Sequence, residues 1–273
     1  MLDSHRLAQL AEHVDAEHAA ALYRTASLGV ERAAGVQFRH VGGAVVAIAA
    51  RVDVLSFNRA IGLGMAEPAT ASHIDEITSA YRAAGASRFF IQLSPAARPA
   101  AIPDWLAARG FVQHNNWMKL WRDASPPPEP NTDLAIVPIG TERAADFAGI
   151  VGAAFQFPAP LQDWLAGGVG QTNTLHYLAL DGDRPVGAAS VFFTGQAGHL
   201  SWAATLPEAR RHGAQSALIA ARLRDGIARG CRWFLSETAE DTPDKPNPST
   251  HNLRRMGFEL LYLRPNYRLS LTP

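Results

Sequence analysis

The second half of the chain alternates short apolar stretches with stretches of helical spacing. The apolar stretches have the length and composition of β-strands, at 134–138, 177–181, 186–193, 199–205, 231–236, 259–263 and 267–271. Helices are predicted at 141–155, 215–229 and 249–255. The turn Asp181-Gly182-Asp183 predicts a hairpin at the start of this half. We therefore expect an α+β fold, with a mostly antiparallel mixed sheet flanked by helices.

The helix predicted at 215–229 is amphipathic. Its apolar face carries Ile219, Leu223 and Ile227. The polar residues expected to point away from that face are Arg222, Asp225 and Arg229.

A proline-rich segment at 124–131 divides the chain. Prolines at 126, 127, 128 and 130 do not fit a helix interior or a central strand. The segment predicts an extended, semi-rigid linker. The predicted organisation is a first domain at 1–123, the linker at 124–131, and a second domain at 132–273, each domain of ordinary size.

The two halves share local patterns in the same order. A helix ended by glycine and followed by a buried strand is predicted at 83–91 and again at 228–235. A short helix closed by glycine and an aromatic residue follows at 106–111 and at 253–258. This order predicts an internal duplication.

Charge and composition narrow the function classes. The 273 residues include 25 Lys plus Arg and 25 Asp plus Glu, for a formal net charge of zero, whereas nucleic-acid binders carry a basic face. The single cysteine, Cys231, excludes an internal disulfide, and the histidine spacings predict no metal site. The charged N-terminus does not resemble a signal peptide, and the apolar run at 41–50 is shorter than the roughly 20 residues that span a bilayer. We expect a cytoplasmic protein without a nucleic-acid or membrane partner.

Candidate chemistry lies between the strand at 199–205 and the helix at 215–229. A helix start leaves N–H donors free and carries partial positive charge, so it binds anions. Gly213 would let a phosphate approach the backbone closely, and Arg210, Arg211 and His212 add positive charge.

This segment resembles motif A of the GNAT superfamily, the acyl-CoA-dependent N-acetyltransferases. Pro207, Arg210 and Gly213 match the motif, and Gln215 stands where the motif has Gly or Ala. The resemblance implies that backbone amides from Arg211 to Ser216 bind the pyrophosphate of CoA. It also implies that the end of the preceding strand pairs with the pantetheine arm. The cofactor-binding residues implied here are Ala203, Ala204, Thr205, Arg210, Arg211, His212, Gly213, Ala214, Gln215 and Ser216.

The segment at 247–258 is similar to motif B of the same superfamily. Asn247, Ser249, Gly257 and Phe258 fit the pattern, and Asn252 would contact CoA. Leu253 replaces the tyrosine that many members carry, so either another group protonates the leaving thiolate or no acid is needed. The resemblance implies two GNAT-like domains, a degenerate one at 1–123 and one at 132–273 that binds acetyl-CoA.

The first half contains Arg59-Ala60-Ile61-Gly62-Leu63-Gly64, which satisfies the same short pattern. The next helix caps, Thr70 or Ser72, come too late to aim amides at a phosphate beside Gly64. We therefore interpret this match as a decoy and expect the first half to line the acceptor pocket or to support the second.

Amine acetylation needs a base that removes the ammonium proton and donors for the developing oxyanion. His199 and Glu237, on neighbouring predicted strands, are the candidate bases, and a purely structural role is open for both. Phe155, Phe157 and Trp164 could form an apolar wall for a hydrophobic or aromatic amine, or could anchor a folded loop.

The sequence predicts a GNAT-type N-acetyltransferase that moves an acetyl group from acetyl-CoA to a primary amine by direct attack. A non-catalytic acyl-CoA-binding or regulatory protein of the same fold, and a plain interaction protein, are the alternatives. The acceptor, a small molecule or a peptide, is not identified, and a homodimer is left open. We expect Gly213→Glu to abolish CoA binding while the fold stays intact.

Overall fold

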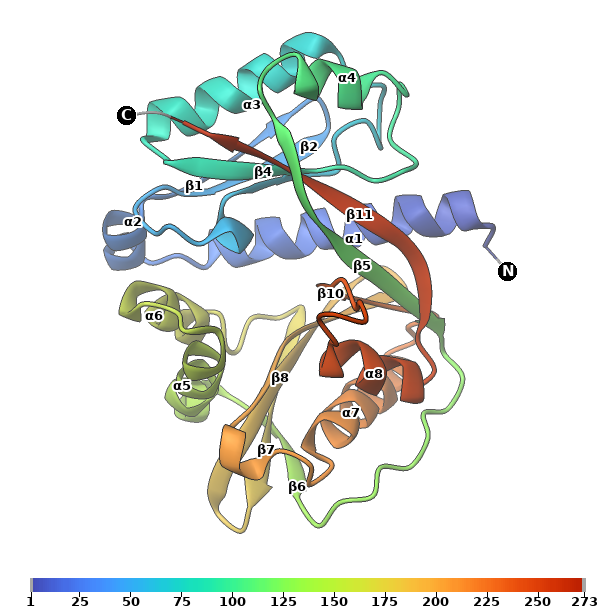
Figure 1. Ribbon diagram of the computed structural model, residues 1–273. Helices are drawn as coiled ribbons and strands as arrows, with labels where there is room; N and C mark the ends of the chain where they lie inside the picture. The colour runs from blue at the N-terminus through green and yellow to red at the C-terminus, as the bar shows by residue number, and fades with distance from the viewer. Residues whose placement is uncertain (1, 272–273) are drawn as a thin grey trace. The chain divides into compact units, whose positions relative to one another are not determined.

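The computed structural model describes residues 2–271 (Figure 1). The chain forms two compact units. The first holds the residues up to Lys119 and the segment from Leu261 onward, and the second runs from Leu120 to Leu260.

The first unit is built from helices α1 to α4, five strands, and the larger part of β5 (Val112–Asp123), which lies beside β11 in the sheet. The helices are α1 (Ser4–Arg24), α2 (Leu28–Ala34), α3 (Ala71–Ala84) and α4 (Ile102–Ala107), with a 3-10 turn at Leu55–Phe57. The strands are β1 (Val36–Val41), β2 (Ala44–Ala49), β3 (Arg59–Ile61), β4 (Arg88–Gln92) and the larger part of β11 (Glu259–Ser270), in the order β1-β2-β3-β4-β11. The pairs are antiparallel except β3 with β4, which is parallel.

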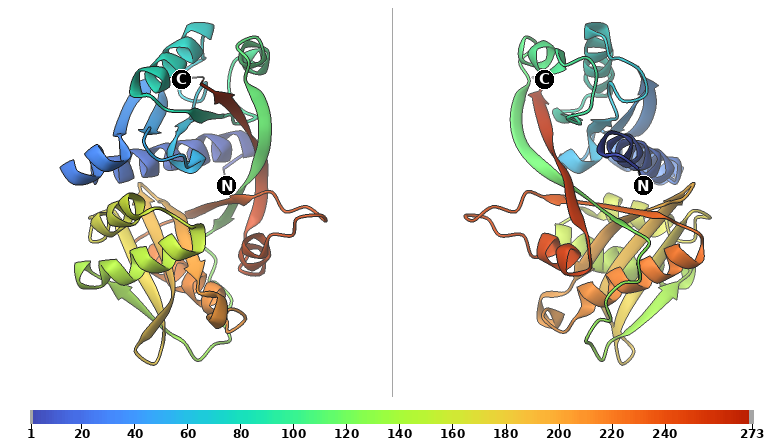
Figure 2. Two further views of the ribbon diagram at one scale, coloured as in Figure 1. Left: turned by 60° about the vertical axis from the view of Figure 1, so that its left-hand side comes forward. Right: turned by 90° about the vertical axis from the view of Figure 1, so that its right-hand side faces the viewer.

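Apolar side chains of β2 alternate between two faces of this sheet. Val46 and Ile48 pack with Ile74 and Ile77 of α3 in one cluster. Val45 packs with alanines of α1 in another. The two helices therefore cover opposite faces, as Figure 2 shows.

The second unit contains four helices and strands ordered β5-β10-β9-β8-β7-β6. The strands are β6 (Ala135–Ile139), β7 (Thr174–Asp181), β8 (Arg184–Thr194), β9 (Ala197–Thr205), β10 (Trp233–Ala239) and the end of β5 (Val112–Asp123). The helices are α5 (Ala144–Phe155), α6 (Ala159–Gly167), α7 (Ala214–Ala228) and α8 (Pro248–Arg255), with 3-10 turns at Thr141–Arg143 and Pro207–Ala209. β6 to β9 pair antiparallel, and β9 pairs parallel with β10. α5 and α6 cover one face of the sheet and α7 the other (Figure 1).

The α+β class and the mostly antiparallel mixed sheet are confirmed. The two units also repeat one series of pairings, antiparallel, antiparallel, then parallel across a helix. In the first unit α3 joins the parallel strands, and in the second unit α7 does so.

The compact units do not follow the predicted domain limits. The proline-rich segment 124–131 lies inside the second unit, and residues 261–271 belong to the first. Glu129 of this segment pairs with Arg224 of α7 at 2.5 Å, and Thr132 just after it donates to the carbonyl oxygen of His212 at 2.5 Å. The segment therefore packs on the second unit along its length.

Three local predictions are corrected. The strands predicted at 259–263 and 267–271 are one strand, β11, because Pro265 keeps an acceptor in the ladder through its carbonyl, which binds the Leu93 amide. The region around Trp164, treated as a loop, forms α6, and burial of Trp164 and Leu165 stabilises it. Arg222, expected to point away from the core, is 1% exposed.

In residues 2–271 no helix combines the length and the apolar character that crossing a bilayer requires.

Candidate functional site

The end of β9 is irregular. Ser201 pairs with Ser190 of β8, and Ala204 pairs with Ala188, so two residues of β9 oppose Ala189 alone. Trp202, the first of the two, has a φ of 50°. This two-against-one arrangement is a β-bulge, which bends the strand and withdraws backbone from the regular ladder.

The loop after β9 turns sharply before α7. Arg211 and Gly213 have φ values of 69° and 78°. A Cβ on Gly213 would lie 2.4 Å from the carbonyl oxygen of Asn131, so a side chain does not fit there. α7 begins directly at Ala214 with no side-chain cap. The first-turn amides of α7 therefore have no acceptor inside the helix and are available to a ligand.

These elements line a pocket of about 890 Å³, a volume typical of ligand-binding sites. Its lining residues come from β9, the loop, the first turn of α7, and α8 from its cap to its last residue: Ala203, Ala204, Thr205, Ala209, Arg210, Arg211, Gly213, Ala214, Gln215, Ser216, Asn247, Pro248, Ser249, His251, Asn252 and Arg255, with Asn131 and Ala154. The predicted cofactor residues are thus brought together, with the exception of His212. The His212 side chain is exposed, and the residue is not among those that line the pocket.

The pocket carries a positive charge at one side. Arg210, Arg211 and Arg255 line it, together with His251. None of the described residues that line the pocket is an Asp or a Glu. Together with the open start of α7, this charge suits a ligand with several phosphate groups.

Gln215, the departure from motif A, has a structural role. Its side-chain amide donates to Thr205 Oγ1 at 3.0 Å. The contact ties the first turn of α7 to the end of β9. The longer side chain therefore holds together the two elements that form the pocket.

Asn247 positions α8. Its side chain accepts from the Ser249 amide at 3.0 Å and donates to the Ala239 carbonyl at 2.8 Å, and its own amide donates to Asp241. The residue caps the helix and fixes its start beside β10. Leu253, at the position of the missing tyrosine, is buried.

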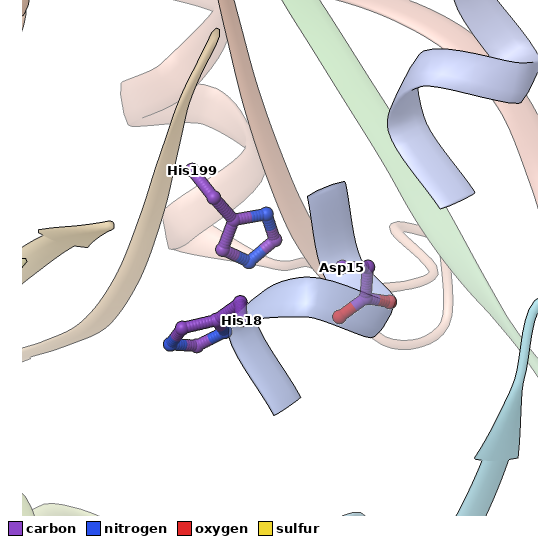
Figure 3. Close-up of side chains that lie close together, drawn as sticks. All are labelled: Asp15, His18 and His199. Atoms are coloured by element: carbon purple, nitrogen blue, oxygen red, sulfur yellow. The ribbon is translucent and has the colours of Figure 1, made fainter. Parts of the chain in front are cut away.

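The candidate bases lie outside the pocket. His199 is buried on β9 (Figure 3), and Ala203 follows four residues later, about 13 Å along an extended strand. Glu237 is half-buried on β10 and is also not among the lining residues. Since Leu235 pairs with His199, strand alternation puts Glu237 and His199 on one face of the sheet. Asp15 and His18, the other residues drawn in Figure 3, lie on successive turns of α1 in the first unit.

An aromatic cluster adjoins the lining residues Ala154 and Ala203. Phe155 stacks on Phe157 with ring centroids 5.4 Å apart, and Trp202 meets both rings edge-on. Phe155 is 48% exposed. Trp164, proposed for the same wall, is buried in the core. The bulge thus places Trp202 in the aromatic cluster, a position that the sequence did not indicate.

The segment at 59–64 in the first unit forms no comparable loop. α3 begins at Ala71 with Thr70 as its cap, one of the two caps, Thr70 or Ser72, that the sequence left open. A Cβ on Gly64 would lie 2.6 Å from the Arg98 carbonyl oxygen, and the Arg98 amide donates to Gly64 at 2.9 Å. Arg59 is buried, 3.4 Å from Asp15 and 3.0 Å from Gln92. The chain itself therefore occupies the space beside Gly64, in agreement with the decoy interpretation.

The expectation for Gly213→Glu is corrected. The positive φ and the contact with Asn131 mean that any side chain at Gly213 displaces the loop. Loss of binding in that variant would not separate charge repulsion from a distorted backbone.

Several lining residues were missed: Asn131, Ala154, Ala209, Pro248, His251 and Arg255. Pro248, His251 and Arg255 fall within the motif B segment, where helical spacing from Asn252 could have indicated Pro248 and Arg255. Asn131 and Ala154 reach the site from other elements, and no sequence signal marks them.

Comparison with known proteins supplies a family. Residues 143–258 match the model of the acetyltransferase (GNAT) family. No curated protein matches the chain significantly.

Solved structures of low identity share the fold. A GCN5-related N-acetyltransferase from Kribbella flavida is 17% identical with a TM-score of 0.63, and the match covers 94% of this chain and 96% of that one. A second, from Sphaerobacter thermophilus, is 16% identical with a TM-score of 0.59, covering 79% and 72%. A tandem GNAT protein from the clavulanic acid biosynthesis pathway is 17% identical with a TM-score of 0.54, covering 74% and 70%. The bulged strand, the glycine loop and the open helix start all lie within residues 143–258, the part of the chain that matches the acetyltransferase (GNAT) family.

Proposed function

We propose that the second unit binds acetyl-CoA and transfers its acetyl group to a primary amine. The observation that carries the proposal is the pocket, in which a cationic loop, an open helix start and a bulged strand end line one cavity. Family membership supports the acyl-CoA class of donor.

Different residues of the pocket would bind successive parts of acetyl-CoA. The first-turn amides of α7, with Arg210 and Arg211, would bind the pyrophosphate. The strand end from Ala203 to Thr205 would pair with the amides of the pantetheine arm. Backbone withdrawn from the ladder at the bulge would donate to the thioester carbonyl oxygen, where negative charge develops.

The reaction needs no covalent enzyme intermediate. The neutral amine attacks the thioester carbon, a C–N bond forms, and the C–S bond then breaks to release the CoA thiolate. Before the attack the ammonium proton passes to a base, which leaves the neutral amine. After the attack the positively charged nitrogen loses a second proton, and water carries it to the thiolate because Leu253 offers no acid. His199 and Glu237 remain our proposed bases. Since neither lines the pocket, intervening water would carry the proton to them.

The aromatic cluster supports a class of acceptor. Phe155 and Trp202 are sequence neighbours of the lining residues Ala154 and Ala203. Among the described residues, no carboxylate lines the pocket to attract a polycation. We favour a primary amine with an apolar or aromatic substituent. A panel of aromatic, aliphatic and polycationic amines, assayed by release of free CoA thiol, distinguishes these classes.

A charge placed at Ser216 tests the donor site. Ser216 is half-buried in the first turn of α7. Ser216→Glu puts a carboxylate beside the phosphates at a helix position that tolerates acidic residues, and Ser216→Gln is the matched neutral control. By calorimetric titration with acetyl-CoA we expect binding to the wild type and to Ser216→Gln, and at least about tenfold weaker binding to Ser216→Glu. Equal affinities in both variants would overturn the assignment. Binding without turnover on any amine would favour a non-catalytic acyl-CoA-binding protein.

A duplication is part of the proposal. The repeated pairing series, and the sequence patterns shared by the halves, support two GNAT-like repeats of which the first lost its cofactor loop. In this reading only the second unit binds acetyl-CoA.

A further inference from the structure

Arg222 is a buried cation on α7, with 1% of its surface exposed. Three backbone carbonyl oxygens accept its hydrogen bonds. Nε donates to Leu218 on its own helix at 2.9 Å. Nη1 donates to Ser190 of β8 at 3.1 Å and to Ser201 of β9 at 3.5 Å. The guanidinium therefore spans both strands.

The two bridged residues mark the start of the bulge. Ser190 and Ser201 are the last regular pair before the register shifts. Their hydroxyls also lie 2.9 Å apart, and Ser190 Oγ contacts the Ser201 carbonyl oxygen at 3.3 Å. Arg222 and these serines thus fix the backbone next to Trp202, whose φ is 50°.

Burying this cation is costly. Desolvation lowers the pKa of Arg222 to about 9. A core position on a helix would ordinarily be more stable with an apolar side chain. A planar guanidinium can, however, bind carbonyl oxygens on two strands at once, which an apolar side chain cannot do. The buried guanidinium therefore fixes the backbone of β9, at a cost in stability that an apolar side chain would avoid.

We infer that Arg222 is a positioning residue, which holds the bulge of β9 in the shape that presents its backbone to the thioester in the pocket. This inference rests on the proposed function for its chemistry, while the clamp on β9 stands on the geometry alone. The bulge residue Ala203 and the following Ala204 line the pocket, so a shift of the bulge would move the proposed donors to the thioester oxygen.

The test compares Arg222→Met and Arg222→Lys with Arg224→Met. Arg224 lies on the same helix, its side chain is 46% exposed, and its partner is Glu129. Arg224→Met is therefore the matched control, because it removes an arginine from the same helix but outside the bulge. Arg222→Lys keeps the charge without the planar fork and is the second variant if Arg222→Met does not fold.

The first measurement is hydrogen exchange of the unliganded proteins. We expect amides of the 201–205 segment to exchange at least about tenfold faster in either Arg222 variant, as loss of a charge-assisted hydrogen bond implies. Arg224→Met should match the wild type. Unchanged exchange in a folded Arg222 variant would overturn the clamp, whether or not the protein binds CoA.

The second measurement is the infrared carbonyl band of acetyl-CoA labelled with ¹³C at the thioester carbon. In the wild type and Arg224→Met we expect the bound band to move to lower frequency. In the Arg222 variants we expect that shift to be lost, while the dissociation constant of CoA itself changes less than about threefold. A full shift in the variants would overturn the link to the thioester. No CoA binding by the wild type would refute the proposed function, and the exchange result would still decide the clamp.

Discussion

One short pattern, an arginine followed by glycine at a fixed spacing, occurs in both units, but the burial of the arginine and the start of the next helix differ. In the second unit Arg210 is exposed at the pocket, and Gly213 directly precedes α7. In the first unit Arg59 is buried in an ion-paired network, and α3 starts well beyond Gly62, the glycine at the same spacing, and beyond Gly64. A short motif therefore acquires chemistry only where a helix starts at its glycine and no other segment fills the space.

The largest expected effect is the loss of stability on replacing the buried Arg59. Arg59→Ala removes one of three cations that pair with Asp15, together with a hydrogen bond to Gln92. It should lower the free energy of unfolding by about 2–5 kcal/mol, because buried hydrogen bonds are lost and the truncated side chain leaves a cavity. Urea denaturation followed by circular dichroism measures the loss. CoA affinity of the folded variant should be unchanged. A stable variant with weakened CoA binding would contradict the comparison.

Substitution of the two glycines comes next. Gly64→Ala and Gly213→Ala each put a Cβ at positive φ and within 3 Å of a carbonyl oxygen, so each should cost roughly 1–3 kcal/mol of stability. Thermal melts measure this cost, and calorimetry measures CoA affinity. Only Gly213→Ala should weaken CoA binding. Equal weakening by Gly64→Ala would mean that the first unit contributes to the donor site.

A smaller effect is expected at the exposed arginine. Arg210→Ala should raise the dissociation constant of CoA about five- to tenfold, the value of one charge-assisted contact, and should reduce its dependence on salt. Stability should not change. Arg184→Ala, another exposed arginine of the second unit, paired with Glu208 and outside the pocket, is the control. Identical behaviour of the two variants would refute a phosphate contact.

The smallest effect concerns acid stability of the first unit. A hydrogen bond from Arg109 holds the pKa of Asp75 below its ordinary value of 3.8. A carboxylate with a lowered pKa contributes stability above its ordinary pKa, and the contribution is lost as the pH falls through the lowered value. The melting temperature of Asp75→Asn should therefore lie slightly below that of the wild type at neutral pH, and the two should converge toward about pH 3. A constant difference across this range would show that the carboxylate's charge is not responsible.

Much of the fold could be predicted because its signals are local. The hydrophobic periodicity of β8 and α7 follows from residues within each element. Many residues that line the pocket come from the single short segment between Thr205 and Ser216. Arg222 could not be predicted, because polarity alone indicates exposure, and its acceptors exist only once β8 and β9 meet at the bulge. The same holds for Asn131, which the fold brings against Gly213, and for β11, whose partner β4 lies far away in sequence.

The pairing of β4 with β11 bears on how the protein is made. Arg88 pairs with Ser270, far away in the sequence. A ribosome releases β4 long before β11, so this edge of β4 stays open to other strands until β11 has been made. Closing so long a loop is also a slow step. The interval between the synthesis of β4 and that of β11 is therefore the period in which the nascent first unit is most exposed to aggregation.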